Sequence, residues 1–192
     1  MQPPARSKNV GIITDAGGPG IMAVDECALR GLNVMRFSAK TIGKFEKMKE
    51  EGKLPQFASG LNPVDITGSG TDAMFESVTK ILFEDPEVSG IILLGLHHTP
   101  AVQEEYIPKV ASFACMCDKP IVACDIGETE MAIRTRSTFD RTGIPAYPSP
   151  EDAARAMDAL VRYGLYLQKK GAMEGYVDNF VQSRKKRYCI RK

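Results

Sequence analysis

Two uninterrupted apolar runs, at residues 90–94 and 120–124, restrict the possible folds of this chain more than any other feature. Each run has the length of a strand and is followed by turn-forming or polar residues. A strand that is apolar on both faces must be covered on both faces, which is typical of a parallel sheet between two layers of helices. The sequence therefore predicts an α/β protein.

Segments of helical periodicity alternate with these and three further strand-like runs. Strands are also expected at Val10–Thr14, at Asn33–Phe37 and, as a proline-containing edge, at Ile144–Tyr147. Helices are expected at residues 21–32, 41–51, 74–82, around 110–113, 128–141 and 150–170. Right-handed crossovers place helices on both faces of such a sheet. We expect a three-layer, flavodoxin-like parallel sheet of about five strands in the order 2-1-3-4-5.

Length and charge indicate one domain, at residues 8–170, followed by a basic C-terminal extension at 171–192. Six of the last nine residues are positively charged: Arg184, Lys185, Lys186, Arg187, Arg191 and Lys192. Such a segment can contact RNA, a membrane or an acidic subunit, but is more often solvated, and we predict neither a nucleic acid nor a membrane partner. No apolar run approaches the roughly 20 residues of a membrane helix, which favours a cytoplasmic protein.

The five cysteines lack the spacing of a disulfide framework, so reduced thiols are expected. Cys115 and Cys117 would diverge by about 200° on a helix, which makes them a poor pair of metal ligands. We predict no metal site.

The turn after the first strand is rich in glycine. Gly17, Gly18 and Gly20 allow close backbone approach, and Pro19 suits the first turn of a helix whose free N–H groups point outward. This arrangement can form an anion site, although a glycine-rich first turn also occurs in such sheets with no ligand. It matches neither a dinucleotide-binding fingerprint nor a Walker A loop, so independent nucleotide binding is not expected.

A polar loop at residues 62–70 and a histidine pair provide the other candidates. A turn followed by an N-cap at Thr71 explains Gly70 and Thr71 but not Asn62 and Asp65. We interpret the polar groups of the loop, with Asn62, Asp65, Thr67 and Gly68 as candidate site residues, as groups that orient a neighbouring loop or a phosphate.

His97 and His98, with Thr99, stand where a strand opens into a turn. An imidazole there can bind or accept a phosphate, although a structural role is an equal alternative. Adjacent strand side chains point to opposite faces, so the two histidines do not suit a shared metal ion.

Five segments resemble, in order, the C-terminal ligase domain of ADP-forming acetyl-CoA and acyl-CoA synthetases, within the succinyl-CoA synthetase superfamily. They are Val10–Ile21, Asn62–Gly68, Phe83–Leu94, Lys119–Val122 and Gly143–Ala154. The resemblance spans about residues 8–165. It implies conversion of acyl-CoA, ADP and phosphate to carboxylic acid, CoA and ATP through a phosphohistidine on a partner domain.

The resemblance also implies what this chain lacks. It implies separate CoA-binding, phosphohistidine and ATP-grasp domains or subunits, so we expect a hetero-oligomer and a chain inactive alone. No cofactor is expected on this chain; CoA, ADP/ATP and Mg belong to the partners. By position, the turn at His97–Thr99 is the candidate to meet the phosphorylated histidine, close to the Gly17–Gly20 turn and the 62–70 loop. The alternative is a stand-alone flavodoxin-like module that binds phosphate or acyl-CoA without catalysis.

Overall fold

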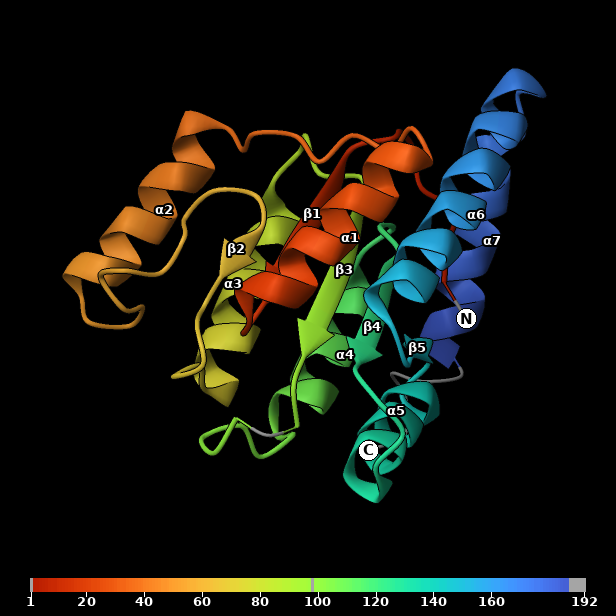
Figure 1. Ribbon diagram of the computed structural model, residues 1–192. Helices are drawn as coiled ribbons and strands as arrows, with labels where there is room; N and C mark the ends of the chain where they lie inside the picture. The colour runs from red at the N-terminus through yellow and green to blue at the C-terminus, as the bar shows by residue number, and fades with distance from the viewer. Residues whose placement is uncertain (1, 98, 187–192) are drawn as a thin grey trace.

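The computed structural model describes residues 2–97 and 99–186, which form one parallel sheet flanked by helices (Figure 1). The sheet order is β2-β1-β3-β4-β5, as predicted. Its strands are β1 (Val10–Thr14), β2 (Val64–Asp65), β3 (Gly90–Gly95), β4 (Ile121–Asp125) and β5 (Ala146–Tyr147). Every residue of β1, β3 and β4 is buried, in agreement with their apolar sequences.

Helices cover both faces of the sheet. Those in the described residues are α1 (Gly17–Leu29), α2 (Ala39–Glu50), α3 (Asp72–Glu84), α4 (Tyr106–Met116), α5 (Glu130–Arg141), α6 (Pro150–Lys169) and α7 (Met173–Arg184). Ile12 and Ile92 pack with residues of α1 and α6, whereas Ile13 and Leu93 pack with residues of α3 and α4. Figure 1 shows α1 and α6 in front of the sheet and α3 and α4 behind it. The chain is therefore a three-layer flavodoxin-like domain.

The prediction of a strand at Asn33–Phe37 is wrong. Only Asn33 pairs with the sheet, through an isolated bridge to Asn9. The Asn62 side chain occupies the next part of this edge: its amide nitrogen donates to Val10 O at 2.8 Å and its oxygen accepts from Ile12 N at 2.9 Å. These groups of β1 are already bonded, and the strand that pairs with β1 at this edge is the short β2, which lies within the predicted 62–70 loop.

The extension after residue 170 includes α7, which packs on the same domain. Arg184 is 3% exposed and donates from Nη1 to Ala114 O at 2.9 Å. At the other end of α7, Glu174 pairs with Arg6 at 2.5 Å. Arg184 is therefore a packing residue and not part of a solvated tail, while residues 187–192 lie outside the described part of the chain.

The cysteines follow the prediction only in part. Cys27, Cys117 and Cys124 carry free thiols, and burial raises the pKa of Cys27 and of Cys124 to about 12, which keeps both as unreactive thiols. Cys115 is disulfide-bonded, so the expectation of a reduced thiol is wrong there. No helix among the described residues is long and apolar enough to cross a membrane.

The N-terminal segment leaves no room for a side chain at Gly164 of α6. A Cβ atom added there would stand 1.8 Å from Ala5 O, in a segment that bonds to α6 through Ala5 N and Leu160 O at 3.2 Å. We expect Gly164→Ala to lower the free energy of unfolding by about 2 kcal/mol, because backbone must move to admit the methyl group. Urea unfolding of the variant measures this loss.

Gly175→Ala in α7 is the matched control. Nothing lies within 4 Å of a Cβ atom at Gly175. The better helix propensity of alanine should raise the free energy of unfolding by up to about 1 kcal/mol. Equal effects of the two substitutions would contradict the close contact between residue 5 and α6.

Candidate functional site at the carboxyl edge of the sheet

A cavity of about 320 Å³ opens between the loop from β3 to α4 and helix α5. It lies beyond the carboxyl ends of β3 and β4, where ligands bind in parallel α/β sheets. Its walls combine apolar and polar side chains: Leu96, His97, Thr99, Pro100, Val102, Gln103, Glu104, Tyr106, Asp125, Met131, Arg134 and Thr135. This edge is the candidate site.

A buried carboxylate directly after β1 holds the first part of the loop. Asp15 is 1% exposed and accepts hydrogen bonds from Leu96 N at 3.1 Å and from Thr99 Oγ1 at 2.8 Å. Burial raises the pKa of Asp15, and the bonds from Thr99 and Leu96 oppose that rise. The predicted residue Thr99 therefore anchors the loop to β1.

A second buried carboxylate, at the end of β4, bonds to the predicted residue His97. Asp125 Oδ1 lies 2.6 Å from His97 Nδ1, and both side chains are almost completely buried. His97 Nε2 lies 2.9 Å from Thr129 Oγ1, at the start of α5. Burial raises the pKa of Asp125, and the bond from His97 opposes the rise. His98 lies outside the described residues.

Glu104 and Tyr106 form the far wall of the cavity. Glu104 has a φ of +63° and accepts a hydrogen bond from Thr135 Oγ1 at 2.6 Å, which ties the loop to α5. The buried Tyr106 ring stacks on Phe75 with centroids 4.6 Å apart. Burial raises the pKa of Tyr106 well above its usual value, so its hydroxyl stays protonated.

The glycine turn forms the first turn of α1, as predicted. Gly17 opens the helix, and its N-cap Ala16 makes no side-chain cap bond. A Cβ atom at Gly17 would stand 3.3 Å from Asp65 Oδ2, which places that carboxylate beside the helix N-terminus. A Cβ atom at Gly18 would meet nothing within 4 Å, whereas Gly20 is buried against Thr14. Gly18 thus lies on the open side of this turn.

The loop at 62–70 divides between the sheet edge and the turn. Asn62 bonds to the backbone of β1 and, at 2.9 Å, to Met35 O. Asp65 Oδ1 accepts from Thr67 N at 2.8 Å, and Thr67 has a φ of +70°. A Cβ atom at Gly68 would meet nothing within 4 Å. The structure therefore brings Asp65 close to the glycine turn, and it places Asn62 on the edge of β1.

Thr129 was not among the residues that the sequence pointed to, whereas Asp15 and Asp125 stand just after expected strands, where ligands bind in such sheets, without being assigned to the site. Asp15 and Asp125 directly follow or end an apolar strand, which is a usable signal, but Thr129 has only the signal of a helix cap. Within the described residues, no group of three or more His, Cys, Asp and Glu side chains is placed to hold a metal ion.

The sheet order and the polar groups at its carboxyl edge define this class of protein: a flavodoxin-like α/β domain with its site beyond the strand ends. The chain belongs to the Ligase-CoA domain family, whose model matches residues 10–165.

The relatives of this chain are longer proteins, and the chain matches only a part of each. The chain is 31% identical over 166 residues to the acetate–CoA ligase [ADP-forming] II subunit alpha of Pyrococcus furiosus, covering 84% of this chain and 35% of that protein. It is 32% identical over 174 residues to the acetate–CoA ligase [ADP-forming] I of Archaeoglobus fulgidus, covering 88% of this chain and 23% of that protein. The chain thus spans about a quarter to a third of the length of these relatives.

Solved structures of longer chains also superpose on most of this chain. A crystal structure from Pyrococcus horikoshii superposes with a TM-score of 0.70 at 31% identity, covering 83% of this chain and 36% of the other. The dinucleotide-forming acetyl-coenzyme A synthetase 1 of Ca. Korarchaeum cryptofilum, in complex with phosphate and ADP, superposes with a TM-score of 0.72 at 24% identity. This superposition covers 91% of this chain and 36% of the other chain, and it supports the assignment of the fold.

The raised pKa of Asp15 predicts a specific pH dependence of stability. The folded protein holds the Asp15 proton more tightly than the unfolded chain, so ionisation costs stability as pH rises from the ordinary value of 3.8 through the raised one. Asp15→Asn removes this cost. We expect the unfolding free energy of the variant, relative to wild type, to increase with pH across that window, as measured by urea unfolding.

Thr99→Val tests the cause. It removes the hydrogen bond that opposes the rise in the pKa of Asp15. The loss of stability caused by Asp15 ionisation should therefore extend to higher pH in Thr99→Val than in wild type. A relative stability of Asp15→Asn that is flat or falls with pH would contradict the burial of an ionisable carboxyl group at this position.

Proposed function

We propose that this chain is the ligase domain or subunit of an ADP-forming acyl-CoA synthetase. The reaction converts acyl-CoA, ADP and phosphate to a carboxylic acid, CoA and ATP, through a phosphohistidine on a partner domain. The observation that carries the proposal is the family match over residues 10–165. The names of curated relatives, which are ADP-forming acetate–CoA ligases or their alpha subunits, support the reaction class.

The short span of the chain supports a requirement for partners. It covers 35% of each of two relatives that are themselves named as subunits. In the proposed complex, CoA, ADP/ATP and Mg bind to CoA-binding and ATP-grasp domains, and the phosphohistidine belongs to a further domain. This chain contributes one wall of the phosphoryl-transfer site and is inactive alone in the synthetase reaction.

The contributing wall is the carboxyl edge of the sheet. The first turn of α1 offers backbone N–H groups at Gly17 and Gly18, and a helix N-terminus stabilises negative charge. Asp65 lies beside the same turn and offsets part of this attraction. The loop that carries His97 and Thr99 is held firmly by Asp15 and Asp125, so it presents a preorganised surface to a partner.

The first experiment is purification of the tagged chain from its native cell extract, followed by an assay of ATP formation. ATP formation that depends on acyl-CoA, phosphate and ADP should co-purify with chains that carry CoA-binding and ATP-grasp domains. A chain that emerges without this activity contradicts the proposal. Phosphate or acetyl-CoA binding by the isolated chain in calorimetry, without the activity, would favour the stand-alone binding module.

Gly18→Ala tests whether the glycine turn faces the reaction. The substitution should not lower the free energy of unfolding, because a Cβ atom there meets nothing within 4 Å. It should lower ATP formation by the complex about tenfold or more, since a methyl group on this turn keeps a phosphoryl group from the backbone N–H donors. Activity and urea unfolding are measured together.

Gly43→Ala in α2 is the matched control, because a Cβ atom there also has nothing within 4 Å. It should leave ATP formation unchanged. Full activity of the Gly18→Ala complex would remove the glycine turn from the proposed site while leaving the synthetase assignment intact.

A further inference from the structure

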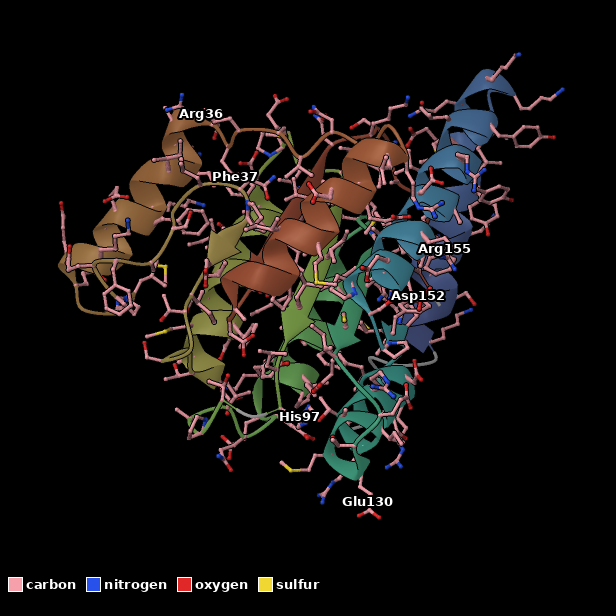
Figure 2. All side chains as sticks on the ribbon, in the orientation of Figure 1. Arg36, Phe37, His97, Glu130, Asp152 and Arg155 are labelled. Carbon is pink, nitrogen blue, oxygen red and sulfur yellow. The ribbon has the colours of Figure 1, made fainter. Side chains whose placement is uncertain are left out.

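Asp125, His97 and Thr129 form a continuous line of hydrogen bonds that ends at the surface. The two distances are 2.6 Å between Asp125 Oδ1 and His97 Nδ1, and 2.9 Å between His97 Nε2 and Thr129 Oγ1. The side chains of Asp125 and His97 are 2% and 3% exposed, whereas Thr129 is exposed. Figure 2 shows His97 and Glu130, the neighbour of Thr129, at the same end of the molecule.

The hydrogen-bonding capacity of these groups allows the arrangement that a general base needs. With Asp125 ionised, its carboxylate only accepts, so it binds a proton on His97 Nδ1 and leaves Nε2 of the neutral imidazole tautomer as an acceptor. Thr129 Oγ1 accepts from Ala132 N at 3.2 Å as the cap of α5, and its own proton can therefore point to Nε2. This is the pattern of a hydroxyl nucleophile, a base and an orienting carboxylate.

Helix capping alone does not account for this line. Ser38, Thr71 and Ser149 cap α2, α3 and α6 in the same way, each accepting from the backbone N–H three residues on. Among these four capping side chains of the described residues, Thr129 is the one bonded to a histidine. A cap needs an acceptor only, and burying a carboxylate and an imidazole behind it carries a desolvation cost.

The surroundings of Thr129 supply the other requirements of acyl transfer. The N–H groups of Glu130 and Met131 lie in the first turn of α5, where a helix has backbone donors without intrahelical partners. Such donors next to a nucleophile can stabilise the oxyanion of a tetrahedral intermediate. The 320 Å³ cavity adjoins the line at His97 and Asp125, and Met131 and Arg134 of α5 line it. A cavity of this size suits a short acyl group.

We propose that Thr129, His97 and Asp125 form a hydrolytic triad that cleaves short-chain acyl thioesters. Thr129 Oγ1 attacks the thioester carbonyl carbon while its proton passes to His97 Nε2. The C–S bond breaks, and the leaving thiolate takes that proton. Water then attacks the acyl-threonine ester, gives a proton to His97, and releases the carboxylic acid as the proton returns to Thr129 Oγ1.

This activity belongs to the chain itself and needs no nucleotide, so it is distinct from the proposed synthetase reaction. Only the choice of a CoA thioester rests on the proposed function. The test therefore uses the isolated full-length chain with acetyl-CoA, and with p-nitrophenyl acetate as an activated ester that tests the same chemistry. Free CoA is measured by chromatography, and acid-quenched protein is digested and mapped for an acetyl group by mass spectrometry.

We expect wild-type chain to release CoA and to carry the acetyl group on Thr129. Thr129→Val should lower the rate at least about 100-fold, and Thr129→Ser, which keeps both hydroxyl and cap, should stay within about tenfold. His97→Gln should lower the hydrolysis rate by a factor similar to that of Thr129→Val. Because His97→Gln leaves buried Asp125 without its partner and can fail to fold, the two Thr129 variants decide the result.

Thr138→Val is the matched control, since Thr138 lies on α5 and bonds within the helix, to Arg134 O at 3.0 Å. It should hydrolyse acetyl-CoA at the wild-type rate. Three results would overturn the proposal: CoA release by wild type no faster than by Thr129→Val, an acetyl group mapped to Cys117 and not to Thr129, or cleavage of the phenyl ester alone. Absence of ATP formation by the complex would contradict the proposed synthetase function but not the proposed triad.

Discussion

The burial of β1, β3 and β4 on both faces is the constraint on which the rest of the structure depends. Strands of this kind must lie parallel between two helical layers, and every connection must cross over a face. All carboxyl ends then meet at one edge. The loops at that edge lie beyond the apolar core between the sheet and the helices, so their positions depend on polar contacts with the strand ends.

Two buried carboxylates provide those contacts. Asp15 binds the start of the β3–α4 loop, and Asp125 binds it through His97. Each carboxylate is costly to bury, as the raised pKa of both groups shows, and each is offset by two or more hydrogen bonds. The same interactions that hold the loop in place also build the wall of the cavity, so stability and the candidate site are coupled at this edge.

The two proposed activities use neighbouring parts of this edge in different ways. The synthetase reaction needs a partner domain on the glycine turn and the β3–α4 loop, while thioester hydrolysis needs Thr129 open to water. A partner docked over α5 would exclude water and protect the acyl group. Docking would thereby suppress hydrolysis in the complex, and dissociation would expose it.

The sequence by itself determined the layers, the central strands and the family, because apolar runs and cap residues such as Ser149 act locally. It missed β2, since a two-residue strand has no periodicity and the Asn62 side chain replaces the backbone on part of the edge. Only the tertiary structure joined His97 to Asp125 and Thr129, which lie 28 and 32 residues away. The parallel register of β3 and β4, which pairs Gly95 with Asp125, brings His97 close to Asp125. No local sequence pattern encodes this register.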